Sequence, residues 1–244
     1  MADNELRIPV WKRLFDLILI GATAPIWLPL MIIVAVAVKI TSPGPVFYRQ
    51  WRVGHGGRHF MILKFRSMKV NACTGAHEDH VERLIRTDQR MTKLDAGGDS
   101  RLIPGGRIMR ASGLDEMPQL FNVVRGEMSL VGPRPCIPRE FEYYQPAQRR
   151  RVQAAPGLTG LWQVMGKNKL TFTEMIALDL QYCDTMSPKL DALIILCTIP
   201  AIVGQLLEVK LKQTALIAEG AEAKPMAAES PTMTVESATM TPAN

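Results

Sequence analysis

The sequence predicts a mainly helical α+β protein that is monotopic, meaning that it enters a membrane from one side without crossing it. A charge-free run, residues 17–38, lies close to the N-terminus. Two β-rich segments around a glycine-rich loop follow it, and later apolar residues recur with a helical period. We expect an N-terminal re-entrant broken helix, a small β-hairpin and interfacial amphipathic helices.

The charge-free run is long enough to reach across a membrane, at about 33 Å as a straight helix. Pro25 and Pro29 lie near its middle, where each removes a helix hydrogen bond and favours a kink. Basic residues, which favour the cytoplasmic face, flank both ends: Lys12, Arg13, Lys39, Arg49 and Arg52. We therefore predict a helix that dips into the inner leaflet and returns. A single crossing with the N-terminus outside is the alternative.

The β-rich segments 46–52 and 58–65 flank a loop with three glycines, which is typical of a β-hairpin. Lys64, near the end of the second segment, and Arg66, directly after it, form a pair of cations. They either form a solvated edge that blocks further strand pairing or contact a phosphate group.

Asp115 and Glu116 are adjacent acids in a cationic part of the sequence. The nearby arginines are Arg107, Arg110, Arg125 and Arg134. This pattern suits phosphoryl chemistry, because a carboxylate can attack phosphorus or hold Mg²⁺ while guanidinium groups neutralise phosphate oxygens. Ser112 and Asp115 also fit a helix capping box. However, Pro118 would remove a backbone donor from that helix, so we expect a helix start near Met117 or a distorted first turn.

The second half of the chain contains three further helical patterns. Residues 138–153 end in three arginines, which are either solvated or in contact with anionic lipid headgroups. Residues 173–183 contain Asp179, either a third acid of the site or part of a solvated face. Residues 192–207 form a second apolar run, which we expect to lie in the membrane interface.

Composition restricts the partners. The 244 residues are 47% hydrophobic and carry a net charge of +6, which favours anionic lipid or phosphorylated substrates. Basic-aromatic repeats are absent from the sequence, so we expect no nucleic-acid partner. Four scattered cysteines indicate free thiols in a reducing compartment. Cys73, His77 and His80 offer only three zinc ligands, whereas structural zinc sites take four.

The chain divides into three predicted parts. Residues 1–40 form the membrane-associated helix, and residues 41–212 form a cytoplasmic or interfacial catalytic domain. Residues 213–244 lack periodicity and are rich in Ala, Thr, Met, Glu, Ser and Pro, so we expect a disordered tail.

Six segments resemble, in the same order, the bacterial sugar transferase family, the monotopic polyprenyl-phosphate phosphoglycosyl transferases. They are KRLFD at 12–16, GPVFY at 44–48, KFRSM at 64–68, LDEMPQ at 114–119, NVVRGEMSLVGPRP at 122–135 and PGLTGLWQ at 156–163. The resemblance runs from about residue 10 to about residue 205. The chain is similar to a minimal catalytic unit, without the extra N-terminal transmembrane domain of larger members.

The resemblance implies a reaction in the bacterial inner membrane, with the active site on the cytoplasmic face. A sugar 1-phosphate passes from a nucleotide diphosphate sugar, usually a UDP-hexose, to polyprenyl (undecaprenyl) phosphate, and UMP is released. This is the first lipid-linked step of exopolysaccharide, O-antigen or glycoconjugate synthesis. The resemblance leaves open which sugar is carried and whether the protein forms a homodimer.

The resemblance also implies residue roles. Asp115 matches the nucleophile that forms a covalent phosphosugar intermediate, and Glu116 matches its acidic partner, so that both are candidate Mg²⁺ ligands. Lys64, Arg134 and Asp179 match positions associated with the active site. We add the cations Arg66 and Arg110 as candidate substrate-binding residues because of their charge and place in the sequence.

The sequence departs from the family pattern at two places. The Ser-Pro pair of the family's re-entrant helix is Ala24-Pro25 here, and the usual Ser-Gly-Arg after Trp-Gln-Val is Met165-Gly166-Lys167. Lys167 keeps a cation but loses the bidentate fork of arginine. Two other functions fit the same acids and cations: a membrane-anchored, Mg²⁺-dependent phosphohydrolase and a non-enzymatic membrane scaffold.

Overall fold

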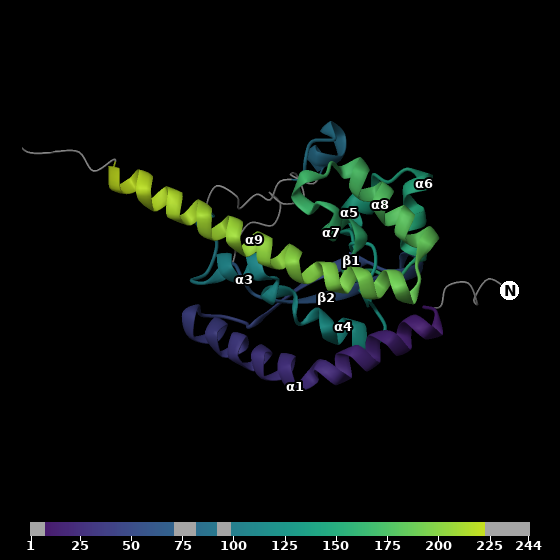
Figure 1. Ribbon diagram of the computed structural model, residues 1–244, viewed down its shortest axis with the longest axis horizontal. Helices are drawn as coiled ribbons and strands as arrows, with labels where there is room; N and C mark the ends of the chain where they lie inside the picture. Colours follow the sequence, from purple (N-terminus) through teal and green to yellow (C-terminus); the bar gives the residue numbers. More distant parts are fainter. Residues whose placement is uncertain (1–7, 71–81, 92–98, 223–244) are drawn as a thin grey trace, which may run out of the picture. The chain divides into compact units, whose positions relative to one another are not determined.

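The computed structural model describes residues 8–70, 82–91 and 99–222, and its elements are mainly helices (Figure 1). The zinc ligands considered above, Cys73, His77 and His80, lie outside the described residues. Residues 82–87 form a short helical segment.

Helix α1 (Val10–Thr41) contains the whole charge-free run. It ends where Ser42, Pro43, Gly44 and Pro45 begin, a run of residues that does not continue a helix. One face is buried at helical spacing through Ile20, Trp27, Met31, Val34 and Val38. The other face exposes Ile18, Ile26, Ile32, Ile33, Val36 and Ile40. This helix therefore packs on the protein along one side and leaves an apolar surface along the other.

The axis of α1 changes direction near its middle (Figure 1). Pro25 and Pro29 lie inside the helix, and proline removes a hydrogen bond and crowds the preceding turn, which accounts for the bend. We expected a broken helix at this place. The structure has a helix that is bent but continuous. By length and composition, α1 and residues 188–207 are each apolar enough to cross a membrane.

The start of α1 is tied to the rest of the protein by buried charges. Lys12 donates hydrogen bonds to Asp191 and to the Tyr182 hydroxyl, and Asp16 accepts one from the Leu130 amide at 3.1 Å. Lys12, Asp16 and Asp191 are all at most 1% exposed. The first turns of α1 therefore contact protein, so that Lys12 does not act only as a flanking charge at a membrane surface.

The predicted hairpin is confirmed. Strands β1 (Phe47–Val53) and β2 (His59–Phe65) pair antiparallel, with Tyr48 opposite Lys64, around the short turn η1 (His55–Gly57). Phe60 and Ile62 of β2 are buried in the same core as the inner face of α1.

A second, parallel pair of strands joins the middle of the chain to a later segment. The elements around it are α3 (Gly106–Ser112), η3 (Leu114–Glu116), α4 (Gln119–Arg125), β3 (Ser129–Val131) and β4 (Gly157–Thr159). Gly126 ends α4 in the left-handed conformation with φ 82°.

Gly132 has no room for a side chain. A Cβ there would lie 2.2 Å from the Ala155 carbonyl oxygen and 2.9 Å from the Gly157 nitrogen. We expect Gly132→Ala to lower the free energy of unfolding by about 1–3 kcal/mol, because the backbones that pair here would have to separate. Thermal unfolding in detergent would measure this. Gly21→Ala is the control, because nothing lies within 4 Å of the added Cβ; equal losses in both variants would contradict the explanation.

The structure corrects the helix predicted over residues 138–153. This stretch forms three short pieces, α5 (Pro138–Glu142), α6 (Pro146–Arg149) and η4 (Arg150–Gln153). Pro146 occupies the first position of α6 and cannot continue the helix before it. Arg151 is 1% exposed, so the prediction that the three arginines together face solvent or lipid is wrong for this one.

The remaining helices are α7 (Leu161–Met165), η5 (Lys167–Lys169), α8 (Phe172–Thr185) and α9 (Pro188–Glu222). Of these, α8 and α9 contain the helices predicted over residues 173–183 and 192–207, whereas α7 and η5 were not predicted. Thr171 caps α8 through a reciprocal pair of hydrogen bonds with Glu174. Helix α9 extends past residue 213, where we expect the tail to begin, and residues 223–244 lie outside the described part of the chain.

Candidate active site

The two adjacent acids lie on the 3₁₀ turn η3, between helices α3 and α4. Gly113 ends α3 in the left-handed conformation with φ 74°, and Pro118, which has no amide hydrogen, precedes the first residue of α4. Ser112 belongs to the last turn of α3, where its hydroxyl donates to the Ile108 carbonyl and accepts from the Leu114 amide at 3.4 Å, and the residue that precedes η3 is Gly113. The structure thus supports the distorted turn expected from Pro118.

Asp115 and Glu116 differ in their surroundings. Asp115 is 6% exposed, whereas the side chain of Glu116 is 35% exposed and pairs with Lys64 of β2 at 2.6 Å. Lys64 is itself largely covered, with 22% of its side chain exposed. The structure therefore brings three of the predicted site residues, Lys64, Asp115 and Glu116, onto two neighbouring elements.

Asn122 holds α4 against the hairpin. Its side-chain amide donates to the Met61 carbonyl at 2.8 Å and accepts from the Leu63 amide at 3.0 Å, and it also donates to Glu127. Asn122 is fully buried. Because it fixes α4 to the residues on both sides of Ile62 in β2, it also fixes the acidic turn that precedes α4 beside Lys64. No role was predicted for Asn122 from the sequence.

A second cluster contains Arg134 and Asp179. Arg134 donates to both carboxylate oxygens of Glu140, at 3.1 and 3.3 Å, and Arg151 donates to Asp179. Tyr144 donates to Glu140 at 2.6 Å and accepts from Arg151. Asp179 is fully buried within this cluster, so its placement on a solvated helix face is excluded.

The buried acids of the second cluster have shifted pKa values. Burial alone would raise the pKa of Glu140, but the guanidinium groups of Arg134 and Arg151 hold it below its ordinary value. Burial raises the pKa of Asp179 to about 6, although Arg151 opposes the shift. Both carboxyl groups are therefore predominantly ionised at neutral pH.

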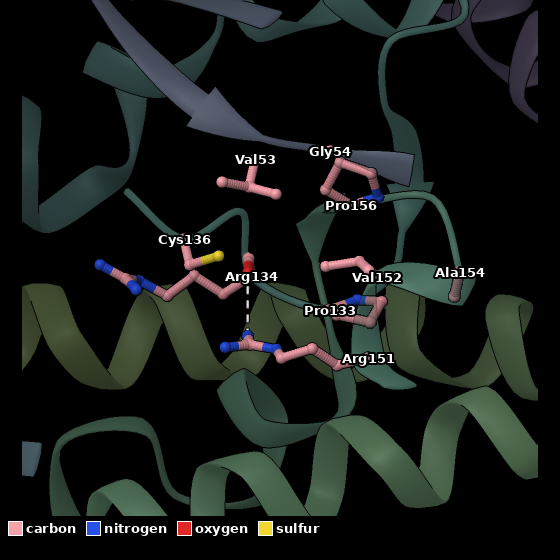
Figure 2. A pocket seen from close by; sticks show the side chains of 9 residues that line it. All are labelled: Val53, Gly54, Pro133, Arg134, Cys136, Arg151, Val152, Ala154 and Pro156. Atoms are coloured by element: carbon pink, nitrogen blue, oxygen red, sulfur yellow. Dashed lines mark hydrogen bonds between the residues drawn. The ribbon is translucent and has the colours of Figure 1, made fainter. Parts of the chain in front are cut away.

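Arg134 and Arg151 also line a small pocket (Figure 2). The other residues that line it are Val53, Gly54, Pro133, Cys136, Val152, Ala154 and Pro156. Its volume of about 10 Å³ holds roughly one water molecule. This pocket is therefore too small for a sugar nucleotide.

The two remaining candidate substrate-binding residues occupy different places. Arg66 is buried and donates to the backbone carbonyls of Ser42 and Pro43, where it joins β2 to the end of α1. Arg110 is half-buried on α3, and together with Arg101 it helps to lower the pKa of Asp99 to about 2; the hydrogen bond from Arg101 is the main cause. The contacts of Arg66 are structural, and its role toward a substrate stays a prediction.

The two carboxylates of the acidic turn fit a Mg²⁺ ion that is also bound by substrate phosphates. Mg²⁺ binds through one or two carboxylates when substrate phosphates and water complete its octahedron, and Asp115 and Glu116 supply that number. Within the described ranges, no group of three or more His, Cys, Asp or Glu residues could hold a metal without a substrate.

Comparisons with known proteins place the chain in a family. Residues 8–205 match the family model described as bacterial sugar transferase. The exopolysaccharide production protein ExoY of Sinorhizobium fredii is 39% identical over 78% of this chain and 84% of its own length. The UDP-glucose:undecaprenyl-phosphate glucose-1-phosphate transferase of Caulobacter vibrioides is 40% identical over 81% of this chain and 72% of its own length.

A third relative is longer. The enzyme of the same name from Xanthomonas campestris is 41% identical over 83% of this chain but only 41% of its own length. The chain therefore belongs to the bacterial sugar transferase family. By class it is an enzyme, a phosphoglycosyl transferase.

Proposed function

We propose that this protein transfers a sugar 1-phosphate from a UDP-hexose to undecaprenyl phosphate and releases UMP, as an initiating step of exopolysaccharide or related glycoconjugate synthesis. One observation carries the proposal: a nearly buried carboxylate, Asp115, lies on a 3₁₀ turn next to Glu116, which is paired with Lys64. The names of the relatives from Caulobacter and Xanthomonas support the choice of substrates.

The proposed chemistry has two steps on one phosphorus atom. A carboxylate oxygen of Asp115 attacks the phosphorus that carries the sugar, a bond to that phosphorus forms, and the bond between it and the UMP oxygen breaks. The phosphate oxygen of the lipid then attacks the same phosphorus, and the bond to Asp115 breaks. Lys64 and Arg134 supply positive charge near the phosphate oxygens, since phosphoryl transfer depends mainly on positioning and charge neutralisation.

A covalent intermediate suits substrates that arrive from different phases. The sugar nucleotide is dissolved in water, whereas the polyprenyl phosphate is confined to the bilayer. Holding the phosphosugar on Asp115 allows UMP to leave before the lipid phosphate enters, so that the site never has to hold three highly charged phosphate groups together.

Mg²⁺ is part of the proposal, with Asp115 and Glu116 as its protein ligands. When bound, it would neutralise the diphosphate oxygens. We expect EDTA to reduce turnover to background and added Mg²⁺ to restore it, measured as UMP release. Ca²⁺ at the same concentration is the control for charge alone, because the larger ion takes longer bonds and more ligands. Undiminished turnover in EDTA would contradict a metal requirement.

We also propose that α1 is re-entrant in the bacterial inner membrane, with the active site on the cytoplasmic face. The exposed apolar face of α1 and its bend support this topology (Figure 1). The test places single cysteines at the two ends, Val10→Cys and Ile40→Cys, where the native side chains are 75% and 79% exposed. An impermeant reagent added to inside-out vesicles should label both, whereas labelling of only one would establish a crossing helix.

The overall proposal is tested with purified protein, a panel of labelled UDP-sugars and Mg²⁺, with and without undecaprenyl phosphate. Formation of a labelled lipid diphosphosugar together with UMP is the expected result. Release of free sugar phosphate without lipid would instead establish a phosphohydrolase. Absence of any turnover across the panel would favour a scaffold.

A further inference from the structure

The backbone carbonyls of the loop that carries Arg134 are all hydrogen-bonded. Four consecutive carbonyls, those of residues 133–136, each accept a hydrogen bond. The donors are the Gly157 amide at 2.9 Å, Arg151 Nη2 at 2.9 Å, Arg52 Nη1 at 3.2 Å and the Val53 amide at 2.9 Å, in that order. Two of these donors are amides of β-strands and two are buried arginines.

Proline on both sides of Arg134 restricts this loop further. Pro133 and Pro135 fix their own φ angles, and Pro135 also restricts the backbone of the arginine before it. The two prolines and the hydrogen bonds to the loop carbonyls therefore together fix the direction in which the Arg134 side chain leaves the backbone. Figure 2 shows the guanidinium of Arg151 pointing at the Arg134 carbonyl, while the Arg134 side chain extends away from it.

The side chain of Arg134 is held as well. One nitrogen, Nη1, donates to Glu140, which is 2% exposed and also accepts from Tyr144. Nη2 and Nε of Arg134 make no hydrogen bond or ion pair with the described residues, and 22% of the side chain is exposed. One edge of the guanidinium is thus anchored, and the other is available to a ligand.

The charges around this loop leave a positive excess. Among the residues that the structure describes, the three cations Arg52, Arg134 and Arg151 face two acids, Glu140 and Asp179. All five are in the interior except for the exposed part of Arg134. Burial, together with the nearby Arg134, lowers the pKa of Arg52 to about 10, which still leaves it cationic at neutral pH. Unpaired charge in the interior is costly, and arginine binds phosphate oxygens strongly, so this excess of positive charge favours an anionic ligand at the exposed part of Arg134.

We infer that Arg151 and Glu140 are positioning residues for Arg134. Arg151, which is anchored by Asp179, fixes the backbone carbonyl of Arg134, and Glu140 fixes the Arg134 guanidinium. The open edge of that guanidinium binds a substrate phosphate. The inference rests on the proposed function, in which both substrates carry phosphate. It gives Asp179 an indirect task, because its carboxylate contacts Arg151 and not the substrate.

A double-mutant cycle on kcat/KM tests this inference. We expect Arg151→Lys to reduce kcat/KM about 10- to 100-fold, because lysine cannot bridge Asp179, Tyr144 and the Arg134 carbonyl at once, and a displacement of about 1 Å of a binding group has effects of this size. Arg134→Met is expected to cause a similar or larger loss. In the double variant, Arg151→Lys should cause no further loss beyond about twofold, because its effect passes through Arg134.

Independent effects would overturn the inference: if the two losses multiply in the double variant, Arg151 acts on folding or elsewhere. Full activity of Arg151→Lys or of Arg134→Met would overturn it as well. Arg150→Lys is the matched control, since Arg150 pairs with Asp184 at the surface with 53% of its side chain exposed, and it should keep wild-type activity. Thermal unfolding of each variant reports the folded fraction separately.

If Arg151→Lys does not fold, Glu140→Gln takes its place in the cycle, with the same expected dependence on Arg134. The activity of the wild-type protein distinguishes a failure of the proposed function from a failure of this inference. Absence of lipid-linked product from wild type would remove the proposed function and this inference together, whereas an active wild type with independent losses would remove only the inference.

Discussion

Replacement of Asp115 by asparagine is expected to abolish formation of the lipid diphosphosugar, with a loss of at least about 10⁴-fold in kcat. The amide has nearly the same shape as the carboxylate but cannot act as the nucleophile. Because Asp115 is nearly buried, the variant's unfolding temperature must be compared with that of wild type to exclude loss of fold. The measurement is transfer of labelled sugar phosphate into the lipid fraction.

Two further variants control this experiment. Asp184→Asn removes an acid that is 56% exposed and should leave the rate unchanged. Glu116→Gln should reduce the rate less than Asp115→Asn, because Glu116 has a supporting role beside Lys64. A rate for Asp115→Asn that is close to wild type would remove the covalent mechanism.

Replacement of Lys12 by methionine is expected to lower the free energy of unfolding by about 3–5 kcal/mol. The ion pair with Asp191 is buried on both sides, with 1% and 0% exposure, so the variant leaves a carboxylate without its cation in the interior. The Tyr182 hydroxyl loses the same donor. Chemical or thermal unfolding in detergent would measure the change.

The double variant Lys12→Met with Asp191→Asn should recover most of that loss, because the buried negative charge is removed together with its partner. Arg150→Met is the exposed comparison, since its pair with Asp184 lies in solvent and should be worth about 0–1 kcal/mol. Equal destabilisation by Lys12→Met and Arg150→Met would contradict the claim that α1 is held by buried charge.

Local patterns predicted the fold where short-range chemistry decides it. The hairpin followed from two β-rich segments around glycines. A distorted turn around Asp115 was one of the two outcomes expected from Pro118, because a missing amide hydrogen limits where a helix can begin, and the structure has a 3₁₀ turn there. In each case, the determining residue lies within a few positions of the feature.

The second cluster was not predictable in the same way. Arg149, Arg150 and Arg151 form one basic run in the sequence, yet only Arg151 is buried, because it pairs with Asp179 of α8 and lies near Glu140 of α5. The sequence does not show which of the three arginines meets these acids. The four-residue spacing of Glu140 and Tyr144 on neighbouring turns was the available signal that these two side chains meet. Likewise, Lys12 follows a membrane-flanking pattern, but its partner Asp191 is distant in sequence.

The measurement that tests the central claim most directly is the mass of the protein after incubation with UDP-sugar and Mg²⁺ and without lipid acceptor. The account predicts an added mass equal to one hexose phosphate, located by fragmentation on Asp115, that disappears when undecaprenyl phosphate is added. An adduct on another residue, or steady transfer to lipid with an unmodified Asp115 at every time point, would contradict it.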